Sequence, residues 1–282
     1  MLRCTSYGEV LRIDLAHTIA GKGRYWTTCY WVDGWLIDTG CAHTARELAQ
    51  VLDGRPVHRI INTHSHEDHI GGNGRLQAAQ PDLLIQAHPL ALPVIANPSA
   101  EQPLHPYRRL FWGWPAASSA LPLEDGQLLE AGPWRFRVVY TPGHSADHLC
   151  LFDENRGWLF SGDLFVGGRD RALRQGGDIW AIMASLQRVW DLPITLLFPG
   201  SARVRENPCD EIQKKLAYYQ ALGEKISRYH LEGRSLDAIV RAACGGPMWV
   251  ELVTLGHFSR KWLVLSYLNK NPQNTGLDQI TG

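Results

Sequence analysis

The 282-residue sequence lacks the marks of several large classes of protein. No apolar run is long enough to cross a membrane as a helix. The first residues, MLRCTSYGEVLRIDLAH, have neither the long apolar core nor the small-residue cleavage site of a signal peptide. Basic and acidic residues balance at 28 each, so no overall field would attract nucleic acid or an anionic membrane. We therefore expect a cytoplasmic protein that binds no membrane, and we do not favour a nucleic-acid partner.

Two further absences concern the chemistry of the chain. No two cysteines form a Cys-x-x-Cys pair, which favours reduced, mostly buried thiols over the one or two disulfides of an exported protein. The six cysteines are Cys4, Cys29, Cys41, Cys150, Cys209 and Cys244. The motif Gly-x-Ser-x-Gly, which presents a nucleophilic serine in one large group of hydrolases, is also absent. A serine nucleophile of that kind is therefore not expected.

What the sequence does contain is a succession of short strands and helices. The Asp33-Gly34 pair between two apolar runs predicts a two-residue hairpin turn. Short apolar or alternating runs predict further strands, at 9–15, 57–62, 83–87, 136–140, 149–152, 158–160 and 195–198. Apolar residues recur at helical spacing over 43–52 and 179–190. This order is typical of an α/β domain.

Two segments depart from this pattern. Residues 88–122 hold many prolines, small residues and aromatics, so we expect either an insertion or lid over a cleft or a long structured loop on the core. From residue 206 the pattern is helical to the end, with helices expected around 212–222, 236–243 and 258–268. We therefore expect a catalytic domain over 1–205 and a small C-terminal helical domain over 206–282, for which a winged helix is one candidate form.

The segment THSHEDHIGG, residues 63–72, carries the strongest chemical signal. Four potential metal ligands fall within six residues, directly after a predicted buried strand: His64, His66, Asp68 and His69. Side chains alternate along an extended chain, so the first two histidines point the same way and can hold one cation. Asp68 and His69 follow at a turn into a helix and can face a second cation. Imidazole suits zinc and iron, whereas carboxylate suits harder ions, which predicts a mixed site.

HSHEDH resembles the HxHxDH signature of the metallo-β-lactamase superfamily, and three other family elements stand in the family's order around it, within a resemblance that covers roughly residues 7–205. His144 lies in a Pro-Gly-His turn, and the resemblance implies that it completes the first metal site. Asp163 lies in a Gly-Asp element, and the resemblance implies that it bridges two metals. Asp38 lies in an Asp-Thr-Gly turn, which is usually structural. The resemblance implies an αββα sandwich with a small C-terminal helical domain, a layout similar to glyoxalase II and LACTB-like proteins.

The sequence departs from the family pattern at one place. Phe198-Pro199-Gly200 is followed by Ser201, where the family usually has its last metal-binding histidine. The second site then keeps only Asp68, His69 and Asp163. Since a serine hydroxyl is a poor metal ligand unless deprotonated, we expect weaker occupancy of the second site or a water in the vacant position.

Two other histidines could be considered for the vacant position. His148 lies four residues beyond His144, where we favour a supporting role behind the metal ligands or a structural role. His257 stands at the start of a predicted C-terminal helix, where we favour a structural role.

The resemblance implies a metallo-hydrolase in which a metal-activated hydroxide attacks a small ester, thioester or lactone. Asp68 is the candidate that orients the water or moves a proton, and His69 binds the second metal. The expected cofactor is zinc, one or two ions, with iron or manganese as alternatives. Two other functions stay open: a metal-dependent nuclease of the same fold, and a low-activity member that binds metal or a metabolite, which Ser201 favours. A homodimer is also open.

Overall fold

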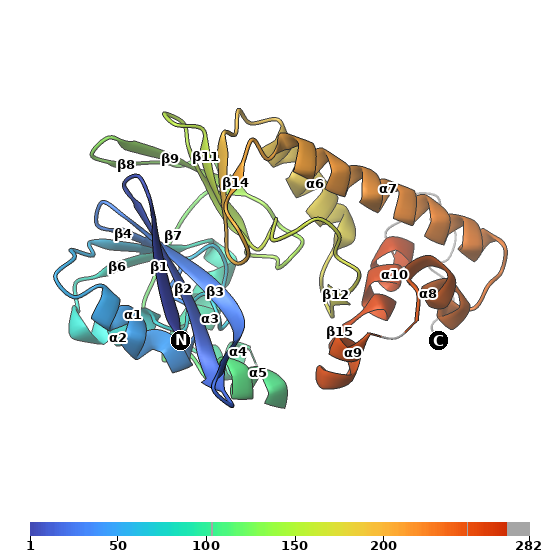
Figure 1. Ribbon diagram of the computed structural model, residues 1–282, viewed down its shortest axis with the longest axis horizontal. Helices are drawn as coiled ribbons and strands as arrows, with labels where there is room; N and C mark the ends of the chain where they lie inside the picture. The colour runs from blue at the N-terminus through green and yellow to red at the C-terminus, as the bar shows by residue number, and fades with distance from the viewer. Residues whose placement is uncertain (103, 247, 270–282) are drawn as a thin grey trace.

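Two facing β-sheets form the centre of the computed structural model, which describes residues 1–102, 104–246 and 248–269 (Figure 1). The first sheet holds seven strands in chain order: β1 (Leu2–Tyr7), β2 (Val10–Ile19), β3 (Lys22–Val32), β4 (Trp35–Ile37), β5 (Arg59–Ile61), β6 (Leu84–Ala87) and β7 (Leu121–Pro122). Strands β1 to β4 pair antiparallel, and β4 to β7 pair parallel. Asp33 and Gly34 have φ of 45° and 81°, the positive values that a two-residue hairpin turn requires, so the predicted hairpin is confirmed.

The second sheet holds six strands in the order β14-β13-β11-β10-β9-β8. Its strands are β8 (Leu128–Ala131), β9 (Trp134–Tyr140), β10 (Leu149–Asp153), β11 (Trp158–Gly162), β13 (Leu196–Pro199) and β14 (Arg205–Glu206). Only β11 and β13 pair parallel, and the crossover between them includes an amphipathic helix. The carboxyl ends of β5, β9 and β11 each lead into one of the segments that carry the predicted metal ligands.

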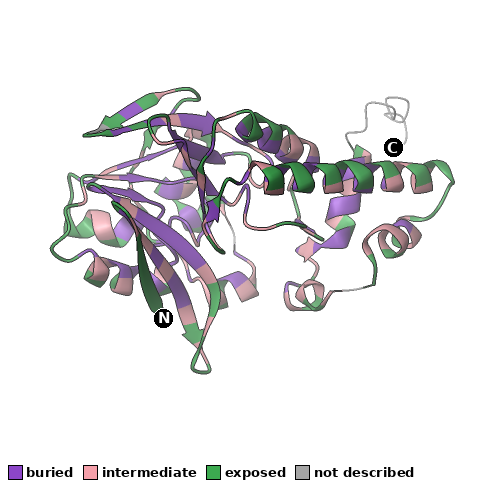
Figure 2. Ribbon diagram, turned by 45° about the horizontal axis from the view of Figure 1, so that its top comes forward, coloured by how far each residue is buried: buried purple, intermediate pink, exposed green. Residues whose placement is uncertain are grey.

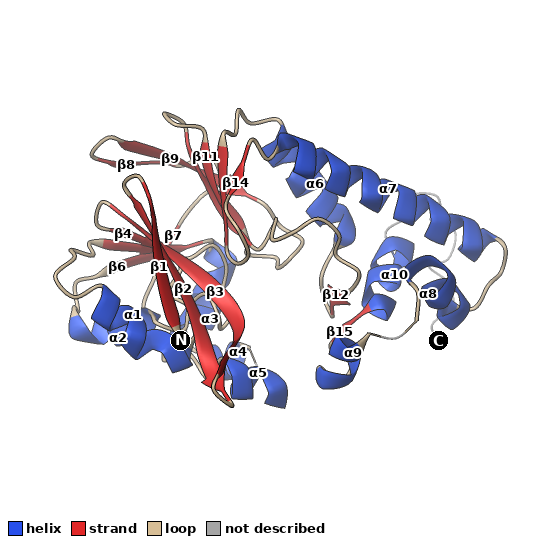
Figure 3. Cartoon of the chain, in the orientation of Figure 1, coloured by secondary structure: helices blue, strands red, loops and turns tan. Residues whose placement is uncertain are grey.

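Helices cover the outer faces of both sheets (Figure 3). The first sheet is covered by η1 (Ala42–Thr44), α1 (Ala45–Val51) and α2 (Asn73–Ala79), and the second by α6 (Ile179–Trp190) and α7 (Cys209–Leu231). Between the sheets lies a buried cluster that includes Tyr30, Ile61, Phe160 and Phe198 (Figure 2). The chain thus forms helix, sheet, sheet and helix layers, and the predicted αββα architecture is confirmed.

Residues 88–122 form a series of short helices that ends in β7. These are η2 (Pro89–Ala91), α3 (Leu92–Ala96), α4 (Pro98–Glu101) and α5 (Pro106–Phe111). Residue 103 of this segment lies outside the described residues. Four of these elements begin with proline at or next to the first helical position, where its missing amide hydrogen costs nothing.

The C-terminal helical region packs beside α6 and α7 (Figure 1). It contains α8 (Leu236–Cys244), α9 (Trp249–Val253), β15 (Phe258–Ser259) and α10 (Arg260–Asn269), while residues 270–282 of the predicted domain lie outside the described residues. The helix expected from 258 begins two residues later, because Phe258 and Ser259 pair antiparallel with β12 (Leu173–Arg174). Within the described residues, we find no helix with the length and apolar character that a membrane span requires.

Candidate metal centre

Three histidine rings from two loops meet at the carboxyl ends of the strands. His64 and His66 follow β5, and His144 follows β9. Nδ1 of His66 lies 2.9 Å from Nε2 of His64 and 3.0 Å from Nε2 of His144. A single hydrogen could bridge only two of these three nitrogens, whereas one cation could bind the lone pairs of all three. The predicted first ligand set is therefore brought together.

The tautomer of His64 is fixed by its neighbours. The hydroxyl of Thr63 donates to Oδ2 of Asp38 at 2.8 Å, so its oxygen is free to accept from Nδ1 of His64 at 3.0 Å. With the proton on Nδ1, the Nε2 atom presents its lone pair to the centre.

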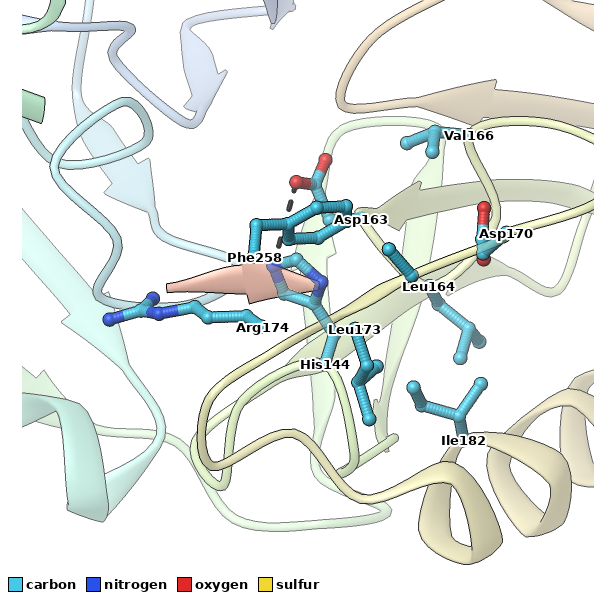
Figure 4. A pocket seen from close by; sticks show the side chains of 10 residues that line it. His144, Asp163, Leu164, Val166, Asp170, Leu173, Arg174, Ile182 and Phe258 are labelled. Carbon is cyan, nitrogen blue, oxygen red and sulfur yellow. Dashed lines mark ion pairs between the residues drawn. The ribbon is translucent and has the colours of Figure 1, made fainter. Parts of the chain in front are cut away.

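A second ligand group lies beside the first and consists of His64, His69 and Asp163. Nε2 of His69 is 3.6 Å from Oδ1 of Asp163 and 4.0 Å from Oδ2 of Asp68. It is buried and has no hydrogen-bond partner among the described residues. A buried nitrogen without a partner is costly, and a cation between these side chains would remove that cost. Asp163 also lies 3.5 Å from Nε2 of His144, so one carboxylate reaches both groups (Figure 4).

Asp38 orients the ring of His69 from behind. Its Oδ2 accepts from Nδ1 of His69 at 2.7 Å, and its Oδ1 accepts the backbone amide of Thr63 at 2.8 Å. Asp38 is buried, and its φ of 59° is a conformation that aspartate tolerates better than most residues. The Asp-Thr-Gly turn therefore aims the free Nε2 atom of His69 at the second group.

The charges around these rings favour a cation at the centre. Burial lowers the pKa of His64 and of His66 well below the ordinary value. At His69 burial also opposes protonation, but Asp38 and Asp163 outweigh it and raise the pKa well above the ordinary value. The second group thus holds an excess of negative charge that a bound cation would neutralise.

His148 supports Asp163 rather than facing the centre. Its Nε2 accepts the backbone amide of Asp163 at 3.1 Å, and its Nδ1 lies 2.8 Å from the hydroxyl of Thr141. Burial lowers the pKa of His148 to about 3, so the ring is neutral. Since both ring nitrogens already have partners, neither offers a lone pair to the second group. His148 lies one residue before β10 rather than within the strand.

Ser201 follows a turn that packs directly against the second group. The amide of Gly200 donates to the carbonyl of Gly162 at 2.7 Å. A Cβ atom on Gly200 would lie 2.6 Å from Oδ1 of Asp163 and 2.9 Å from Cε1 of His69, so only glycine fits there. Ser201 itself is half-buried, and within the described residues no hydrogen bond joins its hydroxyl to Asp163 or to His69.

The residues present fit a divalent metal ion. Imidazole nitrogens and carboxylate oxygens are ligands that zinc, iron and manganese accept, and three of the six predicted ligands, His64, His66 and His69, are nine-tenths buried or more. Asp68 is the most peripheral of the four ligands in the HSHEDH motif, with a side chain 17% exposed. That exposure leaves it open to a substrate or to water.

A second layer of charged and polar residues surrounds the centre, and the sequence did not indicate which of their side chains meet. Glu67 is buried and pairs with Arg108 of α5. Arg174 of β12 contacts Nε2 of His66. His257, expected to be structural, accepts or donates a 2.8 Å hydrogen bond to the hydroxyl of Tyr107 through Nδ1. Each contact joins segments far apart in the chain, which no local pattern could reveal.

An apolar cavity opens beside His144 and Asp163 (Figure 4). Its apolar lining comes from the loop after β11, from α6 and from the β12–β15 ribbon: Leu164, Val166, Ala172, Leu173, Ile182 and Phe258. The C-terminal helical region thus contributes to the cavity through Phe258.

Comparison with known proteins adds family context. The model of the metallo-beta-lactamase superfamily matches residues 27–201, more than half of the chain. The chain is 33% identical over 139 residues to a hydroxyacylglutathione hydrolase of Bdellovibrio bacteriovorus, covering 48% of this chain and 44% of that protein. It is 27% identical over 207 residues to a beta-lactamase-like protein 2 homolog of Drosophila melanogaster, covering 70% of this chain and 64% of that protein. The chain therefore spans about half to two thirds of the length of these relatives.

Solved structures share the fold. A metallo-beta-lactamase family protein from Thermus thermophilus aligns over 92% of this chain and 91% of its own, with a TM-score of 0.64 and 21% identity. A beta-lactamase domain protein from Burkholderia ambifaria aligns over 95% of this chain and 84% of its own, with a TM-score of 0.66 and 20% identity. A third protein, solved in a di-iron-bound form, is 29% identical, covers 67% of this chain and 94% of its own, and has a TM-score of 0.53.

Proposed function

The chain belongs to the metallo-beta-lactamase superfamily, and we propose that it hydrolyses small esters or thioesters, with lactones as a related class. The observation that carries the proposal is the convergence of three imidazole nitrogens beside the unpartnered Nε2 atom of His69. Relatives named hydroxyacylglutathione hydrolase support a thioester substrate. We further propose that residues 1–205 are the catalytic domain, that 88–122 act as its lid and that 206–282 form a small C-terminal helical domain packed against it, in a cytoplasmic protein.

The proposed ligand sets follow the geometry. His64, His66 and His144 would hold the first cation, and His69 with Asp68 would hold the second. Asp163 would be shared, because its two oxygens face His69 and His144 separately. Zinc is the metal we favour, while iron is supported by the relative solved in a di-iron-bound form.

Bound divalent cations supply two effects to a hydrolase: a lowered pKa of water, to about 7, and a polarised substrate oxygen. The remaining tasks fall to this chain. Asp68 would hold or transfer a proton at its Oδ atoms, since its side chain is 17% exposed and is the most open to solvent of the four ligands in the HSHEDH motif. Asp38 and His148 would fix His69 and Asp163 in place. The apolar cavity would bind one side of the substrate and exclude water from it.

Two alternatives remain, each with its own observation. Ser201 favours a member with a weak second site and slow turnover. A metal-dependent nuclease of the same fold is the second; apart from Arg174 the cavity has mostly apolar lining, which offers a phosphodiester backbone few cationic contacts.

The test measures turnover of an acyl thioester, an aryl ester, a lactone and an aryl phosphodiester by zinc-loaded protein. We expect thioester or ester hydrolysis that a chelator abolishes and zinc restores. His66→Ala should lose activity, whereas His58→Ala should retain it, because His58 is an exposed residue outside the centre. Turnover of the phosphodiester alone would support the nuclease, and no turnover despite bound metal would support the low-activity member.

A further inference from the structure

Arg174 stands beside the metal centre without a negatively charged partner. Its Nη1 atom contacts Nε2 of His66, and its Nε atom lies 3.4 Å from Nε2 of His257. Burial and the nearby Arg108 lower the pKa of Arg174 to about 10, which leaves the guanidinium charged at neutral pH. Both of its side-chain partners are imidazoles, which carry no negative charge in either protonation state.

Two other arginines withdrawn from solvent pair with carboxylates. Arg108 pairs with Glu67, and Arg205 pairs with Glu211 at 3.0 Å. In the described part of the chain, by contrast, no carboxylate oxygen lies within the 4.0 Å of an ion pair from Arg174. Glu67 and Asp68 act on Arg174 only from beyond that distance, so the guanidinium can still pair with an anion that comes from outside the chain.

The chemistry of His66 makes Arg174 available when metal is held. Nδ1 of His66 is the atom that faces His64 and His144, so a bound cation takes the lone pair on Nδ1. The ring then carries its proton on Nε2, and two N–H donors cannot bond to each other. A metal-loaded centre therefore removes one of the acceptors of Arg174 and leaves its Nη1 donor for another oxygen.

Arg174 itself lines one end of the apolar cavity, together with His144 and Asp163. In Figure 4 the side chain of Arg174 extends away from Leu164 and Ile182, with His144 and Asp163 between them. A substrate whose reacting carbonyl is at the metal centre would therefore meet a cation on one side and an apolar surface on the other.

We propose that the substrate carries a carboxylate on one side of the scissile bond, bound by Arg174, and an apolar chain on the other, bound by the cavity. This inference rests on the proposed ester or thioester hydrolysis, and it names the kind of ester or thioester. Arg174 acts here as a specificity residue, and the β12–β15 ribbon, which joins it to the C-terminal helical region, holds it at the centre.

The first experiment measures binding without turnover. The probe is 5-oxodecanoate, a ketone that cannot be hydrolysed and that has a carboxylate on one arm and an apolar chain on the other. We expect zinc-loaded protein to bind it about tenfold or more tightly than its methyl ester in calorimetry, since a hydrogen-bonded ion pair contributes that much. Arg174→Gln should abolish this difference in affinity, and Arg174→Lys should keep part of it. The control is Arg46→Gln, which removes one positive charge at an exposed position of α1 and should keep the whole difference.

The second experiment measures kcat/KM for hexanoyl thioesters of mercaptoacetate, 3-mercaptopropionate and 4-mercaptobutyrate, each against its methyl ester. Succinyl and glutaryl thioesters of hexanethiol test the reverse orientation. We expect about a tenfold preference for the anion in one orientation, and its loss in Arg174→Gln.

The outcomes separate the two proposals. Hydrolysis without an anion preference, or a preference that persists in Arg174→Gln with unchanged zinc content, would overturn the role of Arg174 and leave the hydrolase standing. An anion preference in binding that Arg174→Gln removes, with no turnover of any thioester or ester, would support Arg174 and overturn the hydrolase.

Discussion

At the scale of single residues, Asp38 connects the N-terminal sheet to the second ligand group. It accepts hydrogen bonds from His69 and from both the amide and the hydroxyl of Thr63, all within 2.8 Å. A carboxylate behind a ligand histidine fixes its orientation and raises its basicity.

Asp38→Asn should therefore lower the affinity of the second site about 10- to 100-fold and leave the first site nearly unchanged. Zinc titration followed by competition with a chromophoric chelator measures both constants. Asp53→Asn, an exposed carboxylate after α1, is the matched control. Equal second-site affinity in the Asp38 and Asp53 variants would contradict the orienting role.

Ser201 gives the second residue-scale prediction. We expect the native protein to retain one metal more firmly than the second, so its content should fall below two ions per chain after exhaustive dialysis. Ser201→His should raise second-site affinity, because an imidazole would stand next to the Gly200 turn that touches Asp163 and His69. Ser201→Ala should change nothing, since a neutral hydroxyl is a poor ligand. A native protein that keeps two ions through dialysis would refute the weak second site.

His148 links protonation to stability. Burial lowers its pKa to about 3 in the folded chain, below the ordinary 6.5, so between these values the unfolded chain binds a proton that the folded chain does not. Its contribution to the free energy of unfolding is therefore complete above pH 6.5 and is lost as the pH falls toward 3.

The test is denaturant unfolding of metal-free His148→Gln between pH 6.5 and 4.5. As the pH falls, the free energy of unfolding should decrease less steeply in this variant than in the native chain. The two slopes should differ by up to about 1.4 kcal/mol per pH unit. His58→Gln, at an exposed position, should keep the native slope. Parallel slopes for the native chain and the His148 variant would exclude a buried neutral ring.

At the scale of elements, the Pro-Gly-His turn and helix α6 hold each other. Gly143 has a φ of +129°, and a Cβ atom there would lie 2.4 Å from the backbone nitrogen of Ile182. The carbonyl of Gly143 accepts the amide of Asp178 at 2.9 Å, and the side chain of Asp178 caps α6. The start of this helix therefore determines where His144 lies.

Gly143→Ala should both destabilise the chain and weaken first-site metal binding, because the added methyl group pushes the turn off α6. Gly54→Ala is the control: Gly54 also has positive φ, at +74°, but nothing lies within 4 Å of its Cβ position. That variant should cost only the backbone strain, about 1–3 kcal/mol, with unchanged metal affinity. Calorimetric unfolding and zinc titration measure the two effects, and equal losses in both variants would dismiss the contact with Ile182.

Elements also mark how far sequence reasoning reaches. Helix α6 lies at the predicted 179–190, because its regular apolar stripe is a local signal. The ribbon of β12 and β15 escaped prediction, because two-residue strands have no periodicity. The fold and the order of the ligands were thus predictable, whereas Arg174 reaches the centre only through this ribbon and was not.

At the scale of the whole molecule, the two sheets and the C-terminal helical region meet at one centre. The first sheet supplies the HSHEDH loop, the second supplies His144 and Asp163, and the ribbon to the C-terminal helical region supplies Arg174 and Phe258. Ligands so far apart in sequence converge only when the sandwich is assembled. Metal binding should therefore stabilise the folded chain, because the unfolded chain has no such site.

The most direct test of this account is metal content by mass spectrometry of native protein purified without added metal, beside His66→Ala, His144→Ala and the control His58→Ala. The account predicts at least one transition-metal ion per chain in the native and control proteins and its loss in the other two. A native protein that binds no ion even after zinc is added, or ligand variants that keep a full complement, would contradict it.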